Sequence, residues 1–258
     1  MVGFTRLIPA SIRRRLGLTV NSRMDQFEFD QLDEIQPRIK NLYGYSGKLL
    51  EIFAGNQGEI VHKWHHYIPI YDRYLSRYRG TNAKILEIGV QNGGSLSMWR
   101  NFFGHQATLF GIDIDPSCAA LNGKCGQVRI GSQSDTDFLE SIVAEMGGVD
   151  VVIDDGSHIM GDIRKSLTTL FPLLNDGGLY LIEDLHTCYW KIWGGGYKSR
   201  ASFFHMVSEL IDDMHHWYHD SGVKYNNLGN AISGMHIYDS MVIFDKGPVH
   251  TPAHSKVG

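Results

Sequence analysis

Apolar positions along this chain follow two patterns, short continuous runs typical of strands and a wider spacing typical of helices. Five apolar runs of strand length are separated by connections, most of which carry apolar residues at helical spacing; the runs are KILEIGV, TLFGIDI, QVRIGS, DVVIDDG and GGLYLIEDL. Strands joined by helical crossovers predict a parallel sheet with helices on both faces. Two final runs, SGMHIYDS and MVIFDKG, have no helix between them and predict an antiparallel hairpin. The pattern therefore predicts an α/β fold with a mostly parallel, seven-stranded, Rossmann-like sheet.

The first 80 residues lack these strand-like runs. Their apolar residues recur at helical spacing, as at Phe27, Leu32, Ile35 and Ile39. We therefore predict three parts: an N-terminal helical extension over residues 1–80, a ligand-binding α/β domain over 81–250, and a flexible tail over 251–258.

Composition narrows the classes of function. The 258 residues carry a formal net charge of −4, so no basic field suggests a nucleic acid partner. The three cysteines do not suggest a disulfide scaffold, and we expect the protein in the reducing cytoplasm. No apolar run approaches the roughly 20 residues that span a bilayer. The basic start, with Arg13, Arg14 and Arg15, leaves open peripheral contact with an anionic membrane or a partner, beside an ordinary packed helix.

A glycine-rich turn follows the first strand, in EIGVQNGGSLSMW. It has neither the G-x-G-x-x-G of a dinucleotide binder nor the G-K-[ST] of a P-loop. An acid, Asp113, ends the second strand, as expected for a carboxylate that binds ribose hydroxyls. In this order the features resemble the class I S-adenosylmethionine-dependent methyltransferases. The resemblance implies a cofactor site of Glu87 and Gly89 at the methionine portion, Asp113 at the ribose, Gln133, Ser134 and Asp135 at the adenine, with Gly93 and Ser95 in the glycine turn.

Carboxylates gather where the fourth and fifth strands end. Asp154 and Asp155 follow one strand, and Glu183 and Asp184 follow the next. Consecutive parallel strands are commonly neighbours, so these groups should meet and would repel one another without a cation. Oxygen ligands favour a hard cation such as Mg²⁺. His158, in the turn after Asp155, is placed to act as a general base toward a metal-bound hydroxyl.

Each residue of this set also has a plainer interpretation. Asp155 could cap the following helix, and His158 could make an ordinary surface contact. Elsewhere, His215 and His219 have the i, i+4 spacing of a zinc site but no third ligand, so we expect a solvated helix face. The chain has no G-x-S-x-G elbow, so hydrolase chemistry has no support.

The segments LEIGVQNGGSLSMW, GIDIDP, VVIDDGSH and YLIEDLHTCYW are together similar to the magnesium-dependent deoxysugar O-methyltransferases of macrolide pathways, to which the cephalosporin methoxylation protein is related. The similarity covers roughly residues 60–246. It implies Mg²⁺ ligands at Asp155, Glu183 and Asp184, a catalytic base at His158, and Asp154 beside the cofactor sulfonium. A dimer would be in keeping with this class.

The acceptor is expected to be a sugar hydroxyl. Relative to the macrolide enzymes this chain has no counterpart of a large N-terminal domain, and it resembles actinobacterial sugar methyltransferases that act on methylmannose polysaccharides and rhamnosyl glycolipids. We therefore expect a mannoside, oligosaccharide or glycolipid precursor. The segment HTCYWKIWGGGYKSR offers aromatic faces and a glycine-rich lid. The predicted substrate residues are His186, Tyr189, Trp190 and, from the upstream HKWHHYIPIYDRY, Tyr67.

Three other functions stay open at this point. A phenolic or antibiotic acceptor would use the same chemistry. A non-catalytic cofactor-binding subunit would need a partner enzyme, and the intact Asp155, His158, Glu183 and Asp184 set speaks against it. An NAD(P)-dependent oxidoreductase is disfavoured because the G-x-G-x-x-G pattern is missing.

Overall fold

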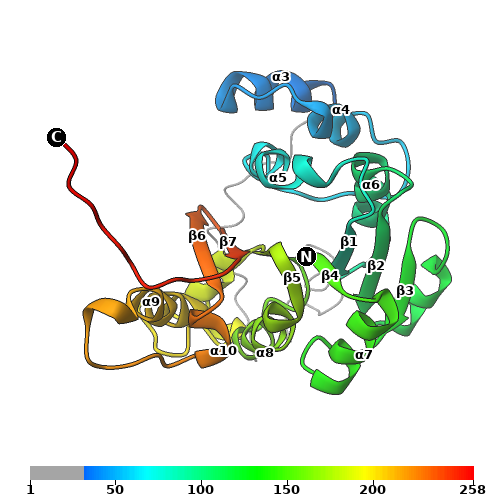
Figure 1. Ribbon diagram of the computed structural model, residues 1–258. Helices are drawn as coiled ribbons and strands as arrows, with labels where there is room; N and C mark the ends of the chain where they lie inside the picture. The colour runs from blue at the N-terminus through cyan, green and yellow to red at the C-terminus, as the bar shows by residue number, and fades with distance from the viewer. Residues whose placement is uncertain (1–31) are drawn as a thin grey trace.

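The computed structural model describes residues 32–258 and contains one seven-stranded sheet (Figure 1). Its strand order is β3-β2-β1-β4-β5-β7-β6. The strands are β1 (Lys84–Ile88), β2 (Thr108–Asp113), β3 (Gln127–Ile130), β4 (Val149–Asp154), β5 (Leu174–Ile182), β6 (Ile232–Tyr238) and β7 (Met241–Lys246). The first five pair in parallel, and β7 pairs antiparallel with both β5 and β6. The predicted fold class is confirmed.

Helices cover both faces of this sheet (Figure 1). They are α3 (Leu32–Tyr43), α4 (Lys48–Ala54), α5 (Tyr67–Leu75), α6 (Gly94–Phe103), α7 (Thr136–Met146), α8 (Met160–Leu170), α9 (Phe203–Met214) and the single turn α10 (Asn226–Gly229). Short 3₁₀ turns fill the connections: η2 (Ser76–Tyr78), η3 (Pro116–Leu121), η4 (Phe171–Leu173), η5 (Leu185–Tyr189), η6 (Lys191–Trp193) and η7 (His216–Tyr218).

Side-chain alternation along the strands divides the core in two. In β4, Val151 and Ile153 pack with α3 to α6, whereas Val152 packs with α7 to α9. Both layers contain fully buried side chains: Trp99 on one side and Phe171 on the other have no exposed surface. Figure 1 shows α5 and α6 on the side opposite α7 and α8. A residue's parity in its strand therefore decides which layer it faces.

The strand register brings the carboxyl ends together. Ile88 pairs with Asp154, and Asp154 pairs with Ile182, so β1, β4 and β5 end level with one another. The strand order reverses between β1 and β4, and ligands of such sheets bind outside the strand ends at this switch point. The fold thus places the residues after β1, β4 and β5 side by side.

Residues 247–258 add no helix or strand after β7. The predicted contacts of Phe27 and of Arg13, Arg14 and Arg15 lie outside the described residues. Residues 251–258 form neither helix nor strand, and all are exposed. No helix within residues 32–258 is long and apolar enough to cross a membrane.

Candidate active site

Three carboxylates meet at the ends of β4 and β5. Asp155 follows β4 directly, and Glu183 and Asp184 follow β5. Glu183 is 1% exposed, while Asp155 and Asp184 are half-buried. Groups of like charge at this depth need opposite charge or hydrogen-bond donors to stay ionised. The protein supplies both.

In each of these carboxylates a protein donor holds one oxygen. Lys63 Nζ lies 2.6 Å from Asp155 Oδ2 and 2.7 Å from Glu183 Oε2. The hydroxyl of Tyr67 lies 3.1 Å from Asp184 Oδ1, and also accepts from the Asp184 backbone amide at 3.1 Å. One oxygen of every carboxylate is therefore fixed, and the other is left to bind something else.

The remaining oxygens lie near His158. Its Nε2 is 3.6 Å from Asp155 Oδ1 and 3.9 Å from Asp184 Oδ2. Within residues 32–258, Asp155, His158 and Asp184 are the group whose ligand atoms all lie within 4.8 Å of one another. Glu183 lies outside that tight group. Its buried Oε1 makes no hydrogen bond of ordinary geometry within the described residues, although the buried Tyr71 hydroxyl lies close to the Glu183 carboxylate. A buried carboxylate oxygen without a partner is costly, and an oxygen-preferring cation would satisfy it.

The electrostatics of the cluster are strongly perturbed. Burial and the neighbouring Asp155 raise the pKa of Glu183 well above its ordinary value. Although burial opposes its charge, Asp155 and Glu183 raise the pKa of Lys63 above the usual lysine value. Burial acts to raise the pKa of Asp184, but His158 and His186 outweigh it and leave it lowered. The two carboxylates thus favour the charged form of Lys63.

His158 is held in an uncommon backbone conformation. Its φ of 55° lies in the left-handed region, and its side chain is 5% exposed. The ring meets the edge of Trp193 from η6, with centroids 6.1 Å apart. Asp184 shares the left-handed conformation, with φ of 54°. Non-glycine residues of this kind cluster at functional sites, where the surrounding structure holds them in place.

The glycine turn after β1 lies next to the acidic cluster. Gly89 has φ of 90°, and a Cβ there would lie 2.2 Å from the Asp155 carbonyl oxygen, so only glycine allows the ends of β1 and β4 to approach. Gly93, with φ of 81°, precedes α6. Asp113 at the end of β2 accepts hydrogen bonds from the Gln91 and Asp115 amides, each 2.9 Å long. These three predicted cofactor residues therefore lie around one turn at the switch point.

Glu87 faces the α5 and α6 layer. Its Oε1 accepts a 2.9 Å hydrogen bond from the Trp99 indole, and its Oε2 is buried with no donor among the described residues. Burial raises the pKa of Glu87 to about 7, against the lowering effects of Lys63 and of Ser95 in the first turn of α6. The predicted cofactor residues Glu87 and Ser95 thus lie together behind the glycine turn.

Two other predicted cofactor residues use their side chains inside the protein. Asp154 is 2% exposed, and its carboxylate accepts from Ser166, Tyr180 and Gln133 at 2.6, 2.9 and 3.2 Å. Gln133 also accepts from the Ser157 amide at 2.6 Å. The structure turns Asp154 toward α8, away from Asp155, because successive strand residues face opposite sides.

The last two predicted cofactor residues lie in the turn before α7. Asp135 is exposed and caps α7 by accepting from the Phe138 amide at 3.1 Å. The hydroxyl of Ser134 lies 2.8 Å from that of Ser132. Both follow β3, which is separated by β2 and β1 from the strands that carry the acidic cluster.

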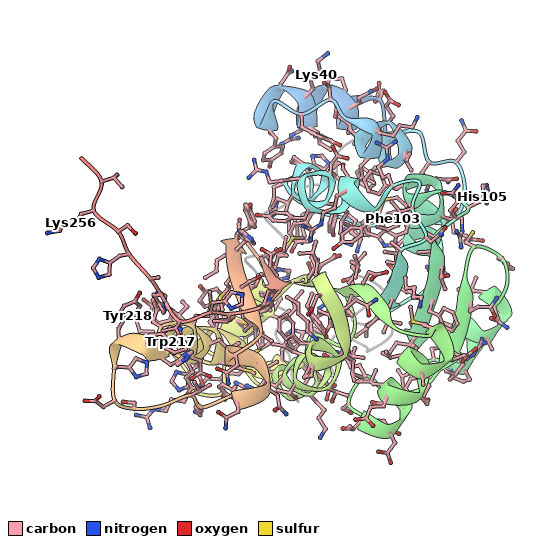
Figure 2. All side chains as sticks on the ribbon, viewed as in Figure 1. Lys40, Phe103, His105, Trp217, Tyr218 and Lys256 are labelled. Atoms are coloured by element: carbon pink, nitrogen blue, oxygen red, sulfur yellow. The ribbon has the colours of Figure 1, made fainter. Side chains whose placement is uncertain are left out.

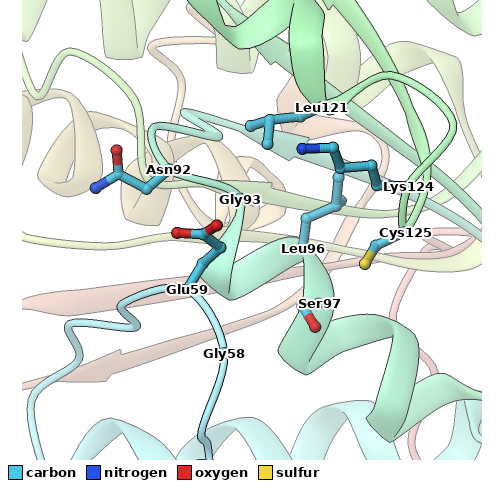
Figure 3. A pocket seen from close by; sticks show the side chains of 9 residues that line it. All are labelled: Gly58, Glu59, Asn92, Gly93, Leu96, Ser97, Leu121, Lys124 and Cys125. Atoms are coloured by element: carbon cyan, nitrogen blue, oxygen red, sulfur yellow. The ribbon is translucent and has the colours of Figure 1, made fainter.

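A pocket of about 340 Å³ opens on the outer side of the glycine turn (Figure 3). Its lining comes from the segment before α5, from α6 with the turn before it, and from the connection between β2 and β3: Gly58, Glu59, Asn92, Gly93, Leu96, Ser97, Leu121, Lys124 and Cys125. Only Gly93 belongs to the predicted cofactor residues. The acidic cluster is not part of this pocket.

The predicted substrate residues fall into three different places. His186 and Trp190 meet edge to face, with centroids 4.9 Å apart, and Trp64 packs against His186 at 5.8 Å. Tyr189 instead stacks with Tyr197, 6.4 Å away, and contacts Phe204, so it belongs to a different surface from Trp190. We call Trp64, His186 and Trp190 the aromatic wall.

The position of Tyr67 differs from the one expected for a substrate-binding residue. It has no exposed surface, and its hydroxyl is engaged by Asp184 and by the Ser240 carbonyl oxygen at 3.0 Å. No face of this ring is free to meet a substrate, so its position is that of a support for Asp184. The hydroxyl of Ser240 similarly holds His186 Nδ1 at 2.6 Å.

The sequence indicated neither Lys63 nor Ser240 as part of the acidic cluster. Lys63 is separated from Asp155 by 92 residues and from Glu183 by 120, in an irregular segment without periodicity. A lysine flanked by aromatic and histidine residues just before a helix was the available signal.

Comparison with known proteins identifies relatives of this chain. No family model matches the chain. It is 37% identical over 200 residues to demethylmacrocin O-methyltransferase of Streptomyces fradiae, covering 72% of this chain and 50% of that enzyme. It is 34% identical over 195 residues to mycinamicin VI 2″-O-methyltransferase of Micromonospora griseorubida, covering 71% and 48%. The chain thus spans about half the length of the curated relatives it matches.

A solved structure agrees. The MycE methyltransferase of the mycinamycin pathway, in complex with Mg, SAH and mycinamycin VI, superposes with a TM-score of 0.67 at 28% identity, covering 94% of this chain and 62% of MycE. Another MycE structure, with Mg and SAH in crystal form 1, gives a TM-score of 0.64 at 30% identity, covering 86% of this chain and 56% of MycE. With the strand order and the sequence relatives, this shows that the chain belongs to the family of class I sugar O-methyltransferases found in macrolide and tetracenomycin pathways.

Proposed function

We propose that this protein transfers a methyl group from S-adenosylmethionine to a sugar hydroxyl with the help of Mg²⁺. The observation that carries the proposal is the acidic cluster: three carboxylates, each with one oxygen held by the protein, whose other oxygens include two near His158 and one left buried without a partner. Relatives with this activity and a neighbour that holds Mg and SAH support it.

The cofactor is assigned to the turn at the end of β1. Gly89 and Gly93 give this turn its positive-φ backbone, and the Asp113 carboxylate would accept from ribose hydroxyls. Glu87 and Ser95 lie behind this turn and would support the methionine portion from below. Asp154 would act as a positioning residue and not contact the cofactor, because its carboxylate already accepts hydrogen bonds from Ser166, Tyr180 and Gln133.

The acidic cluster fits a magnesium ion. Asp155 and Asp184 would bind it through the oxygens nearest His158, and Glu183 would bind through its unpartnered Oε1. Coordination to Mg²⁺ makes a hydroxyl more acidic, and this is the chemistry the ion would supply here.

His158 is the proposed general base. It lies beside the carboxylate oxygens that would bind the metal, so it is within reach of a hydroxyl that shares the ion with them. It accepts the hydroxyl proton, the oxygen takes the methyl group of S-adenosylmethionine, and S-adenosylhomocysteine leaves. Fixing the donor and acceptor in line supplies much of the rate.

The aromatic wall is the proposed acceptor subsite. Trp64 and Trp190 flank His186, and burial lowers the pKa of His186, which favours its neutral form. Flat apolar faces with polar tips are well suited to a sugar ring. The finer proposal, a mannoside or oligomannoside acceptor, rests on the resemblance described for the sequence.

The test is release of S-adenosylhomocysteine against a panel of methyl mannosides, rhamnosides and partly methylated sugars, each with Mg²⁺ and with EDTA. Turnover that EDTA abolishes and Mg²⁺ restores is expected. His158→Ala should abolish turnover and leave S-adenosylmethionine binding by calorimetry unchanged. His205→Ala, whose ring pairs with Glu209 on α9, is the matched control and should behave as wild type. EDTA-resistant turnover, or an active His158→Ala variant, would contradict the assigned roles.

A further inference from the structure

Lys63 is a buried cation placed at the centre of the acidic cluster. Its side chain is 2% exposed, and its ammonium forms ion pairs with Asp155 and Glu183. Burying an ammonium group is expensive unless it is paired, and the two carboxylates pair it closely. The lysine is therefore not an accidental neighbour of the site.

The formal charges suggest what it does. With a cation bound, Asp155, Glu183 and Asp184 would carry one negative charge each and Lys63 one positive charge. The sum of these four groups is −2, which a divalent cation neutralises. Without the lysine the sum would be −3, and the site would favour a cation of higher charge.

The contacts also show that Lys63 leaves the metal ligands free. It holds Asp155 through Oδ2 and Glu183 through Oε2. Asp155 Oδ1 stays beside His158, and Glu183 Oε1 makes no hydrogen bond of ordinary geometry among the described residues. The ammonium thus adds its charge without occupying the oxygens that face the proposed ion.

We propose that Lys63 is a positioning residue that sets the charge of the acidic cluster, so that the site accepts a divalent cation in preference to a trivalent one. The inference rests on the metal site of the proposed function. It concerns a residue that touches neither the ion nor the substrate and acts through Asp155 and Glu183.

The test compares two cations of similar size and ligand preference, Ca²⁺ and Tb³⁺, added to the full chain without acceptor. Calorimetry measures Ca²⁺, and sensitised luminescence measures Tb³⁺. A unit charge about 6 Å from the ion, at an effective dielectric constant of about 20, changes the ratio of the two affinities by roughly 100-fold. We expect Lys63→Met to raise the Tb³⁺ to Ca²⁺ affinity ratio by that factor. The ratio cancels any loss of site geometry that weakens both cations alike.

Three variants keep the test decisive. Lys63→Arg retains the charge with a different shape, so its affinity ratio should stay within about threefold of wild type by the same Coulomb argument. Lys63→Gln replaces Lys63→Met if the apolar variant fails to fold, as judged by circular dichroism. Lys48→Met removes a lysine whose ion pair with Glu51 is exposed, and it should leave the ratio unchanged.

The outcomes separate two hypotheses. An unchanged ratio in Lys63→Met, with both cations still bound, would overturn the role of Lys63 and leave the metal site standing. Binding of neither cation by the wild type, or binding that Asp184→Asn leaves intact, would overturn the metal site and the inference together. A raised ratio in Lys63→Met, with rescue by Lys63→Arg, is the expected result.

Discussion

Replacing Tyr67 with phenylalanine removes one oxygen atom from the support of Asp184. The hydroxyl is fully buried, donates toward Asp184 Oδ1 and the Ser240 carbonyl, and accepts from the Asp184 amide. The Ser240 carbonyl keeps a second partner, the Leu185 amide at 2.9 Å. The groups that lose a bond are therefore the carboxylate and amide of Asp184.

The magnitude follows from these two losses. A hydrogen bond to a charged group contributes about 1.5–3 kcal/mol, and an unsatisfied buried amide costs about 1–3 kcal/mol. Asp184 is half-buried, so water will recover part of this. We expect the free energy of unfolding of Tyr67→Phe to fall by about 2–4 kcal/mol. Its affinity for Mn²⁺ should fall about tenfold, equivalent to about 1.4 kcal/mol, because Asp184 is no longer fixed.

Urea denaturation and Mn²⁺ titration measure the two quantities. The control is Tyr74→Phe, which removes a partly buried hydroxyl 2.7 Å from that of Tyr238. We expect it to cost no more than about 1 kcal/mol and to leave Mn²⁺ affinity unchanged. If Tyr67→Phe loses no more stability than this control and binds Mn²⁺ as the wild type does, Tyr67 does not position Asp184.

Three further predictions concern other parts of the site. Burial raises the pKa of Glu87 to about 7, so the folded state holds its proton more tightly than the unfolded state, and stability should fall as pH rises from about 4.5 to 7; Glu87→Gln should flatten this fall, by up to about 3 kcal/mol in denaturation at several pH values. Gly89→Ala should lower stability by at least about 2 kcal/mol in urea and abolish S-adenosylmethionine binding by calorimetry, because its Cβ would overlap the Asp155 carbonyl. Trp190→Ala should raise KM for the sugar acceptor at least about tenfold with a smaller change in kcat, whereas Trp217→Ala, in η7 after α9 (Figure 2), should change neither; equal effects would remove the aromatic wall from the acceptor site.

The succession of strands along the chain could be predicted from the sequence because each apolar run is short and followed by a distinct connection. The meeting of Asp155 with Asp184 followed from one rule, that consecutive parallel strands are usually neighbours, and β4 and β5 obey it. The local pattern and one topological rule are therefore enough to predict the acidic cluster from the sequence.

Side-chain direction was harder to predict, although part of it was encoded. Parity along β4 places Asp154 on the side of Val152, toward α8, and parity along β5 places Glu183 on the side of Leu181, toward Lys63. Lys63 itself could not be found in this way. It lies in an irregular segment, and its partners are distant in sequence, so no periodicity relates them.

The left-handed backbone at His158 and Asp184 has a consequence for protein engineering. Each costs roughly 1–2 kcal/mol relative to an ordinary conformation, and glycine or asparagine at either position would relieve that cost. A library selected for heat resistance alone should therefore accumulate substitutions at these two positions and yield robust, inactive proteins. Thermostabilisation of this protein is best done with both codons held fixed.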